Sequence, residues 1–581
     1  MHSAIVMTLS HIPVSALAPS FTLPAIDKLT PGSRALLLAQ ERLQDAFQLA
    51  SRIRDQHLFI ADYPGVAREP LFKALCDAQG WQPRNLVALK QEGEPELQWR
   101  EPSGDNVGSL AKQESAYAYV NGPLRRADLI GKMTTVGGKR QYQPGLLAKH
   151  NWLFLSADSL CRRESLWDFL LQVLSQGFYR VSDELPKVPL HTTLVLVGHA
   201  GIYSELKTHE PQFNECFPLL GEVNNEMDLT RHHELEYGSW LVALAQEAGV
   251  TLDESALLPL FLHGSRLSEH QQRLALAGQD MVQLFAQAAA YRGTSHLDGK
   301  AITKALQQAE HRHNISERFS AQSFDDSFIN LLTDGEKVGQ INGLTVIDSI
   351  DYSYGEPARI TATVHYGDGE VADIERKSEL GGNIHAKGMM ILSACLYRIF
   401  GRDAPLHLNA NIVFEQSYQE IDGDSASLAE YCALMSAIAE QPIRQSLAVT
   451  GALDQFGNVQ AIGGVNEKIE GFFSLCERRG LTGEQGVIIP KANLLQLNLD
   501  PKVIEAVKTG RFQLYQVAHM DEAVELLMDL PAGVADEDDN FPEGTLYGMV
   551  QQRLDKLAGH DDEEPLGFFA RLLAKWTSRG N

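Results

Sequence analysis

Three short, uninterrupted apolar runs in the first half of the chain constrain its fold most strongly. They are Leu58–Ala61, Trp152–Leu155 and Thr193–Val197, and helical patterns such as Leu166–Leu174 lie between them. Apolar runs of this length are typical of strands buried on both faces, and the intervening helices provide the crossovers that parallel strands require. The sequence therefore predicts an α/β layer built on a parallel sheet. The segment 101–150, rich in Gly, Lys and Arg, is predicted to form surface loops between strands.

The periodicity of the apolar residues changes twice further along the chain. Residues 235–315 carry Ala- and Leu-rich periodic runs and are predicted to be helical throughout. After Ser320, alternating and β-branched segments, with Asn342-Gly343 and Asp368-Gly369 as turns, predict a second domain of α+β type that includes a helix starting at Ser425. Four parts are expected: an α/β domain over 1–215, a helical subdomain over 216–320, an α+β domain over 321–530, and an acidic linker with a short helix, Phe568–Trp576, over 531–581.

Composition and charge exclude several classes of protein. With 50 Lys and Arg against 75 Asp and Glu, the 581 residues carry a formal net charge of −25, which argues against a nucleic-acid partner because such binders need a basic face. The 6 cysteines lie far apart and the His-containing runs lack metal spacing, so neither a disulfide framework nor a metal site is expected. No run of about 18 apolar residues occurs and the N-terminus lacks a signal-peptide pattern, so we expect a cytoplasmic protein without a membrane span.

The loop after the first apolar run lies where a phosphate-binding loop would lie in such a fold. The pattern G-x-x-x-x-G-K-[ST] requires a Lys for the phosphates and a hydroxyl for Mg²⁺. Here only Pro64 and Gly65 remain close to it: Asp62 would repel a triphosphate, Arg68 replaces the Lys and Glu69 replaces the hydroxyl. We interpret the segment as a scaffold that no longer hydrolyses ATP. Weak nucleotide binding without turnover and true ATPase activity are the alternatives.

Asp422-Gly-Asp-Ser-Ala-Ser-Leu-Ala429 is the stretch that points most directly to chemistry. A Gly-containing turn places Ser425 before an apolar-periodic helix, where unpaired backbone N–H groups form a ready oxyanion site. On this segment alone, Ser425 or Asp424 acting as a helix cap is the simpler interpretation.

A second stretch, Gly463–Ile469, changes that balance. It places Lys468 just inside a helix that follows a Gly-Gly turn, among apolar neighbours. Burial and the helix dipole both lower the pKa of such an amine and favour the neutral form that can act as a base. Ser–Lys pairs are an alternative to the Ser-His-Asp triad, whereas a surface Lys is the interpretation without chemistry.

Taken together, these residues resemble the proteolytic domain of the Lon protease family (peptidase S16), most closely its B-type branch. The resemblance covers 320–530 and rests on the motifs Phe414–Tyr418, Asp422–Ser427, Ala448–Gly451 and Ile462–Lys468. It implies Ser425 as the nucleophile, Lys468 as the general base and Thr450 as a hydrogen-bond partner of that lysine. It also implies that Asp422 orients the loop and that N–H groups near Asp424 and Ser425 stabilise the tetrahedral oxyanion.

The N-terminal half resembles the AAA+ module of the same family. The expected fold is thus an α/β AAA+-like module with a helical lid, followed by an α+β Lon-type proteolytic domain. Residues 216–315 match the lid, but Leu274–Phe285 contains no Arg, so the sensor arginine of the lid is missing as well. These departures argue against ATP and Mg²⁺ as cofactors, and the peptide-bond chemistry itself requires none. The resemblance implies protein substrates and a homo-oligomer, a hexameric ring with proteolytic sites facing an internal chamber.

The leading hypothesis is a Lon-like serine endopeptidase that hydrolyses unfolded or loosely folded proteins with little or no ATP dependence. Two alternatives stay open. One is an ATP-dependent Lon protease with an unconventional nucleotide site, and the other is a non-proteolytic AAA+-like scaffold or chaperone that binds clients. The Ser425/Lys468 pair counts against the second alternative.

Overall fold

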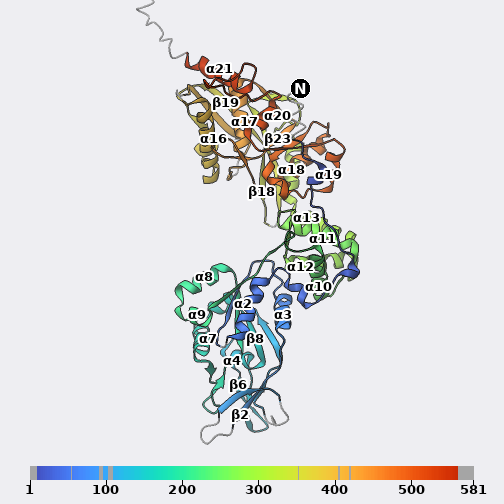
Figure 1. The fold of residues 1–581 in the computed structure, drawn as a ribbon, viewed down its shortest axis with the longest axis vertical. Coiled ribbons are helices and arrows are strands. Elements are labelled where there is room, and N and C mark those ends of the chain that lie inside the picture. Colours follow the sequence, from blue (N-terminus) through green and yellow to red (C-terminus); the bar gives the residue numbers. More distant parts are fainter. Residues whose placement is uncertain are drawn as a thin grey trace, which may run out of the picture. The chain divides into compact units, whose positions relative to one another are not determined.

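The chain folds as two compact units in a computed structural model that describes residues 10–53, 55–89, 96–102, 109–350, 352–402, 406–417 and 421–559 (Figure 1). Unit 1 comprises Met1–Ser20, Glu269–Gln271 and Gln308–Asn581, and unit 2 comprises Phe21–Ser268 and Gln272–Gln307. The predicted helix Phe568–Trp576 lies outside the described residues. The finer division into four parts stays a prediction.

Unit 2 is built on a parallel sheet of five strands in the order β12-β1-β11-β8-β5. The three apolar runs singled out in the sequence are the adjacent strands β1, β11 and β8, so the predicted parallel pairing is confirmed. The strands span β1 Leu58–Ala61, β5 Ser115–Val120, β8 His150–Ser156, β11 Thr193–Gly198 and β12 Leu219–Glu222.

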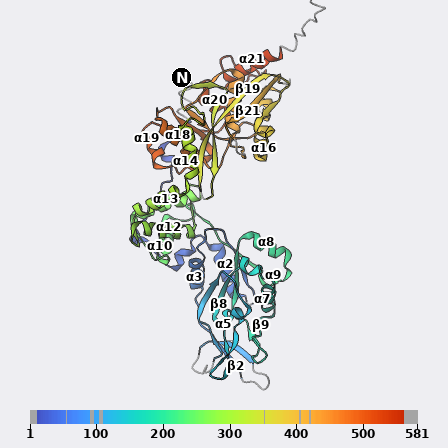
Figure 2. The same cartoon turned by 180° about the vertical axis from the view of Figure 1, so that it is seen from behind.

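Helices cover both faces of this sheet because side chains alternate along each strand. On one face, Leu58, Ile60 and Phe154 pack into a core with α2 and α3. On the other face, Phe59 and Leu153 pack with α7 and α9, and α3 and α7 lie on opposite sides of β8 (Figure 2). The helices span α2 Glu41–Arg52, α3 Arg68–Gln79, α6 Ala157–Cys161, α7 Glu164–Gln176, α8 Ala200–His209 and α9 Pro211–Cys216.

The prediction of surface loops over 101–150 is wrong for much of its length. The segment contains the edge strand β5, the helices α4 Arg126–Ile130 and α5 Leu146–Lys149, and an antiparallel hairpin of β6 Lys132–Val136 and β7 Lys139–Gln143. Its polar composition reflects a two-stranded hairpin whose side chains are mostly exposed. One of its glycines is required by packing, since a Cβ on Gly131 would lie 2.2 Å from the carbonyl oxygen of Gln143. A small antiparallel sheet of β2 Asn85–Leu89, β3 Glu96–Arg100 and β4 Ala111–Lys112 also belongs to unit 2.

The helical part of unit 2 follows the sheet. Its helices are α10 Glu234–Glu247, α11 Leu257–Leu267, α12 Gly278–Arg292 and α13 Gly299–His313, of which the last continues past the unit boundary at Gln307. Short strand pairs interrupt them, β13 Glu226–Asp228 with β15 Arg273–Ala275, and β14 Thr251–Leu252 with β16 His296–Leu297. The prediction of helix throughout 235–315 is therefore correct for the helices and wrong for the short strands β14, β15 and β16, which lie within that range.

Unit 1 is built on a mixed sheet of seven strands in the order β20-β21-β19-β18-β23-β26-β27. β18, β19 and β21 pair antiparallel, and the other neighbours pair parallel. The strands span β18 Gln340–Asp348, β19 Ser353–Tyr366, β20 Val371–Asp373, β21 Leu408–Glu415, β23 Leu447–Val449, β26 Gly486–Pro490 and β27 Gln513–Val517.

Both faces of this sheet are buried. Ile488 of β26 belongs to a core with α16, α17, α20 and α21, whereas its neighbours Val487 and Ile489 belong to a second core with α18 and α19. The helices span α14 Ile315–Asp325, α15 Ile374–Lys377, α16 Asn383–Phe400, α17 Ser427–Ala439, α18 Val465–Arg479, α19 Pro501–Lys508, α20 Met520–Met528 and α21 Leu546–Ala558. The acidic pattern predicts a linker over 531–581, yet α21 packs on α17 in the first core.

Asn342-Gly343 does not form the predicted turn. Both residues lie inside β18, between β19 and β23. Asn342 is fully buried, and its side-chain amide donates hydrogen bonds to the carbonyl oxygens of Leu332 (2.9 Å) and Gln445 (2.8 Å). The conformation is thus decided by partners that are distant in sequence, which the dipeptide alone does not contain.

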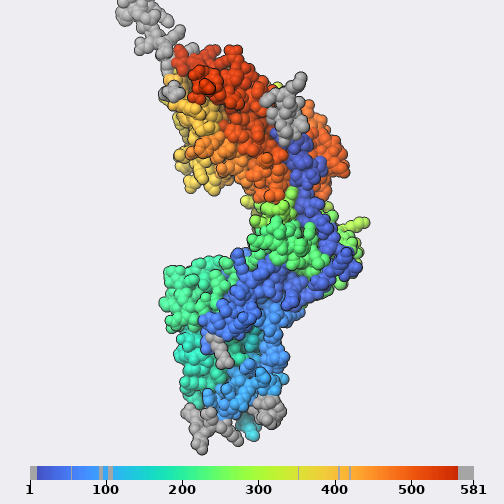
Figure 3. Space-filling model, viewed as in Figure 1, coloured from blue at the N-terminus to red at the C-terminus, as the bar shows by residue number. Residues whose placement is uncertain are grey.

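The first described residues of the chain belong to unit 1. The Ile12 N–H donates to the carbonyl oxygen of Leu514 in β27 (2.9 Å), and His11 forms an isolated bridge with Tyr515. Ile12 and Leu17 are fully buried in the core with α18 and α19. The segment therefore covers the sheet edge that β27 would otherwise expose, and Figure 3 shows its blue atoms against the orange residues.

No helix among the described residues combines the length and the apolar character needed to cross a bilayer.

Candidate active site

Ser425 lies in a turn directly before α17. The helix begins at Ser427 with Ala426 as its N-cap residue, and no side chain caps it. The interpretation of Ser425 or Asp424 as a helix cap is therefore wrong. Instead the Ser427 hydroxyl donates to the Asp424 carbonyl oxygen (2.8 Å) and accepts from the Leu453 N–H (2.9 Å), which fixes the turn without using the Ser425 hydroxyl.

Lys468 reaches the same turn from the beginning of α18. This helix passes very close to β19, since a Cβ on Gly355 would lie 2.0 Å from the carbonyl oxygen of Glu467, and one on Gly471 would lie 2.1 Å from that of Gly355. Only glycine at these two positions permits the approach. The close packing buries the lysine, whose exposed fraction is 3%.

The two candidate residues share one hydrogen bond. Lys468 Nζ donates to Ser425 Oγ at 2.8 Å and to Thr450 Oγ1 at 3.3 Å, and the buried Thr450 hydroxyl donates to the Ser425 carbonyl oxygen at 3.2 Å. Burial lowers the pKa of Lys468 to about 8, against an opposing effect of the Asp424 carboxylate. A serine hydroxyl therefore contacts an amine that gives up its proton near neutral pH, as nucleophilic catalysis requires.

Backbone donors surround the candidate nucleophile. Within the described part of the chain, the N–H groups of Asp424, Ser425 and Ala426 donate no hydrogen bond. The Ser425 carbonyl, in contrast, accepts from the Gly451 N–H at 2.8 Å, so the turn is held by its acceptors and leaves its donors available. N–H groups in this position can stabilise a developing oxyanion.

Asp422 anchors the turn on its N-terminal side. Its Oδ1 accepts hydrogen bonds from the N–H groups of Ile384 (3.0 Å) and His385 (3.3 Å) in the first turn of α16. The adjacent Ile421 exchanges backbone hydrogen bonds with Leu380 (2.8 Å) and Gly382 (2.9 Å). A carboxylate at a helix N-terminus satisfies otherwise unpaired donors. These contacts support the orienting role predicted for Asp422.

A cleft of about 820 Å³ opens beside Ser425 and Lys468. It is lined by the end of β18, the start of β19, the turn Ile421–Ala426 and the Gly463-Gly464 turn. A volume of this size is large enough for a short segment of polypeptide. The cleft and the hydrogen-bonded pair together provide a place for a peptide bond next to a nucleophile.

One wall of the cleft is an open strand edge. β18 pairs with β19 along its whole length, but it pairs with β23 only at Asn342 and Gly343. Backbone N–H and C=O groups point to opposite sides of a strand at successive residues. Asn342 directs these groups toward β23, so every second residue after it directs them to the same side, away from β19. These residues are Leu344, Val346 and Asp348, which line the cleft. An extended peptide can pair with such an edge through its main chain.

The loop expected at a nucleotide site is closed by an internal ion pair. Arg68 donates to both carboxylate oxygens of Asp62, from Nε at 2.7 Å and from Nη2 at 3.2 Å, and its Nη1 donates to the Tyr119 hydroxyl at 2.9 Å. The Asp62 side chain is buried. This bidentate pair neutralises the Arg68 charge and holds the guanidinium on Asp62 and Tyr119, and Glu69 adds a second carboxylate where the phosphate-loop pattern has the hydroxyl for Mg²⁺. These residues do not fit ATP with Mg²⁺.

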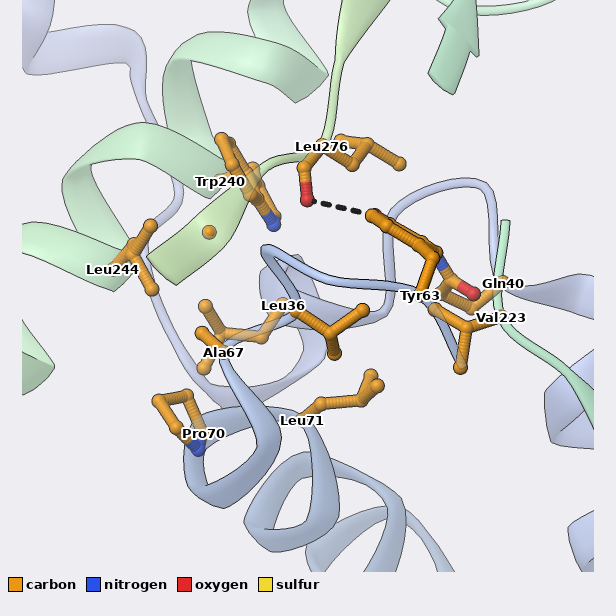
Figure 4. A pocket seen from close by; sticks show the side chains of 12 residues that line it. Leu36, Gln40, Tyr63, Ala67, Pro70, Leu71, Val223, Trp240, Leu244 and Leu276 are labelled. Atoms are coloured by element: carbon orange, nitrogen blue, oxygen red, sulfur yellow. Dashed lines mark hydrogen bonds between the residues drawn. The ribbon is translucent and has the colours of Figure 1, made fainter. Parts of the chain in front are cut away.

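The space beside this loop is divided between two cavities. One, of about 30 Å³, lies among apolar side chains that include Leu36, Leu71 and Trp240, and Tyr63 crosses it to donate a hydrogen bond to the carbonyl oxygen of Leu276 at 3.1 Å (Figure 4). It holds about one water molecule and is too small for a nucleobase. The other, of about 590 Å³, is lined by Pro64, Gly65 and the Arg68 side chain that is already paired, among others.

The structure brings together the residues predicted for the peptide chemistry and adds others. Ser425, Lys468, Thr450 and Asp422 meet at one turn, with Asp424 beside the lysine. Ser427 was not singled out from the sequence, although it lies in the Asp422–Ser427 motif. Its hydroxyl, two positions after Ser425, could have indicated a residue that holds the turn. His385 and Glu430 near this turn gave no signal, because only the fold places them together.

An α+β domain that presents a serine hydroxyl to a buried lysine beside a peptide-sized cleft defines the class of serine peptidases. The family model of the Lon protease (S16) C-terminal proteolytic domain matches residues 403–529. A putative Lon protease homolog of Escherichia coli K12 is 35% identical over 442 residues, covering 73% of this chain and 74% of that protein. The putative Lon protease homolog of Haemophilus influenzae is 37% identical over 445 residues, 74% of this chain and 73% of its own. The archaeal Lon protease of Archaeoglobus fulgidus is 30% identical over 234 residues, 40% of this chain and 34% of its own.

The chain therefore belongs to the Lon protease family. The relatives from Escherichia coli and Haemophilus influenzae extend the similarity well beyond the proteolytic domain.

Proposed function

We propose that this chain is an endopeptidase that hydrolyses unfolded or loosely folded proteins, with Ser425 as the nucleophile and Lys468 as the general base. The hydrogen bond of 2.8 Å between the buried Lys468 Nζ and Ser425 Oγ carries this proposal. The open edge of β18 supports an extended polypeptide as the substrate, because main-chain pairing accepts many sequences but requires an unfolded segment.

The reaction begins when neutral Lys468 Nζ accepts the Ser425 hydroxyl proton and Oγ attacks the carbonyl carbon of the scissile bond. The N–H groups of the turn stabilise the oxyanion of the tetrahedral intermediate. Lys468 then returns its proton to the departing amine, which leaves an ester of Ser425. Water, deprotonated by the same amine, attacks this ester, and Ser425 is regenerated as the acid product leaves.

Loss of the nucleophile tests the proposal directly. Ser425→Ala is expected to abolish the degradation of casein, an unfolded protein, and Lys468→Ala is expected to be comparably inactive because the pair acts as a unit. Ser417→Ala, a serine of the same cleft outside the pair, serves as the matched control and should keep its activity. Cleavage by Ser425→Ala at the rate of the unmodified protein would sink the assignment.

We further infer that hydrolysis proceeds without ATP and that unit 2 acts as an AAA+-like scaffold. The bidentate Arg68–Asp62 pair and the position of Glu69 support this inference. Casein degradation with and without ATP and Mg²⁺ tests it, and equal rates are expected. Strict dependence on ATP would instead identify an unconventional nucleotide site, and casein binding without cleavage would identify a non-proteolytic scaffold or chaperone.

The assembly and location of the protein are inferred from family resemblance. We infer a homo-oligomer, a hexameric ring that encloses the clefts, in the cytoplasm. All six cysteines are free, which fits a reducing compartment. Light scattering on the eluting protein measures the assembly, and a monomer that degrades casein at the full rate would contradict the ring.

A further inference from the structure

A cluster of charged side chains lies buried in the protease unit, outside the pair described above. It contains His385 of α16, Glu430 of α17, and Asp373 and Glu375 at the junction of β20 and α15. Their exposed fractions are 1%, 1%, 7% and 3% in that order. Buried charges are costly unless they are paired, so three carboxylates around one imidazole require an explanation.

The imidazole lies between carboxylates from two different elements. His385 Nε2 is 3.2 Å from Asp373 Oδ2 and 3.9 Å from Glu430 Oε1. These three atoms form no hydrogen bond with the described residues, so the charges are compensated within the cluster itself. The side chains of the described residues include no group of three placed to hold a metal ion. A positive imidazolium is therefore what balances the carboxylates.

The remaining contacts of the cluster hold its carboxylates in place. Asp373 Oδ1 accepts from the Glu375 N–H at 3.0 Å, and Glu375 Oε1 accepts from the Phe414 N–H at 2.9 Å. The ring of Phe414 packs edge-on against the His385 ring with centroids 5.8 Å apart. Burial raises the pKa of Glu430 to about 7. For His385, burial opposes protonation, but the neighbouring carboxylates raise its pKa above the ordinary value. The charged imidazole is thus favoured.

The position of His385 connects this cluster to the nucleophile. Its backbone N–H, together with that of Ile384, binds Asp422 on the N-terminal side of the turn. Its side chain faces Glu430 in the helix that begins two residues after Ser425. α16 also approaches the turn directly, since a Cβ on Gly388 would lie 3.2 Å from Asp424 Cβ. One residue therefore contacts the segments on both sides of the nucleophile.

We propose that His385 is a positioning residue for Ser425, and that its imidazolium, held between Asp373 and Glu430, fixes α17 against α16 so that the nucleophile turn keeps its geometry. This inference rests on the proposed function. An ion pair is suited to such a task because it fixes geometry rather than adding stability, and apolar replacements of buried pairs are often no less stable. Removing the imidazole leaves the Glu430 and Asp373 carboxyl groups without this partner. Glu430 must then either take up a proton or stay buried as an unpaired charge, and in both cases the contact that holds α17 against α16 is lost.

His385→Gln tests the proposal, with His365→Gln on the exposed part of β19 as the matched control. We expect His385→Gln to lower kcat for a short peptide about tenfold with KM nearly unchanged, and to slow the labelling of Ser425 by a fluorophosphonate by a similar factor. The double variant His385→Gln/Glu430→Gln removes the stranded carboxylate and is expected to recover most of the labelling rate. A purely structural role would change thermal stability without this recovery.

Labelling of His385→Gln at the rate of the His365→Gln control would overturn the proposal, as would a double variant no faster than the single one. If His385→Gln does not fold, Glu430→Gln alone is used, and about threefold slower labelling is expected; an unchanged rate would overturn it. Ser425→Ala separates the two levels of inference. Labelling that persists in Ser425→Ala contradicts the proposed function, whereas its loss combined with normal labelling of His385→Gln contradicts only the role of His385.

Discussion

Lys468 meets two opposing demands at a single position. It must be buried next to Ser425 to act as a base, and burial makes its charged form unfavourable, which lowers its pKa to about 8. The ammonium form donates hydrogen bonds but cannot accept the serine proton. The neutral form can accept it, so in the proposed mechanism the fraction of neutral amine sets the rate of the first step.

The pH dependence of hydrolysis follows from this pKa. Below pH 8, each decrease of one pH unit lowers the fraction of neutral Lys468 about tenfold. For a peptide whose own charges do not titrate, we therefore expect log kcat/KM to rise with pH with a slope near one up to about pH 8, and to level off above it. Initial rates of peptide hydrolysis between pH 6 and pH 10 measure this profile. A rate independent of pH across this range would contradict Lys468 as the base.

The same burial affects the free energy of unfolding. Because the folded pKa of about 8 lies below the ordinary lysine value of 10.5, the destabilising effect is fully present below pH 8 and is relieved as the pH rises toward 10.5. Lys468→Met should therefore be inactive yet more stable, by on the order of 1–3 kcal/mol at pH 7, with a smaller gain at pH 10. Urea unfolding of both proteins at the two pH values measures the difference, and a variant less stable at pH 7 contradicts the expectation.

At the scale of elements, α21 completes the protease unit. Its residues Leu546 and Val550 are fully buried against the core of α17, and its Tyr547 hydroxyl donates to Asp521 at 2.5 Å and accepts from the Tyr431 hydroxyl at 3.1 Å. The helix that begins beside the nucleophile is thus covered by residues more than a hundred positions later. Although acidic residues precede α21, the helix therefore forms part of the core of unit 1.

Truncating a buried side chain of α21 tests this assignment. Leu546→Ala is expected to lower the free energy of unfolding of unit 1 by about 2–5 kcal/mol because it leaves a cavity, whereas Gln552→Ala on the exposed side of the same helix should change it by less than about 0.5 kcal/mol. Equal effects of the two substitutions would show that α21 does not pack as described.

Features that depend on nearby residues could be predicted from the sequence, whereas features that depend on packing between distant segments could not. Ser425 and Lys468 could be chosen as candidates because each lies in a short motif whose local structure, a turn followed by a helix, is determined by nearby residues, and the structure joins the two side chains by a hydrogen bond; their catalytic roles stay a prediction. His385 and Glu430 could not, since their meeting depends on how α16 packs against α17. Asn342-Gly343 carries a strong turn signal that partners on two neighbouring strands override. The helix Leu546–Ala558 was not predicted because acidic residues precede it. An acidic run predicts a solvated linker, but the apolar side chains that follow pack into a core formed by distant segments.

At the scale of the whole molecule, each unit has its own cores, so two unfolding transitions are expected. Arg68→Ala leaves the buried Asp62 carboxylate without a partner. It should lower the free energy of unfolding of unit 2 by about 3 kcal/mol, while casein cleavage continues. Lys73→Ala breaks the exposed pair with Glu247 and should cost less than about 1 kcal/mol. Calorimetry of the three proteins checks this, and equal shifts in both variants would contradict a buried pair.

The hydrogen bond between Ile12 and Leu514 sets an order of events during synthesis. Residues 10–20 emerge from the ribosome well before β27, the strand they cover, is translated. At 5–20 residues per second, roughly 25 to 100 s separate the two. Translation of unit 2 is therefore finished while residues 10–20 still lack the strand on which they pack, and unit 1 is complete only once β27 has joined them.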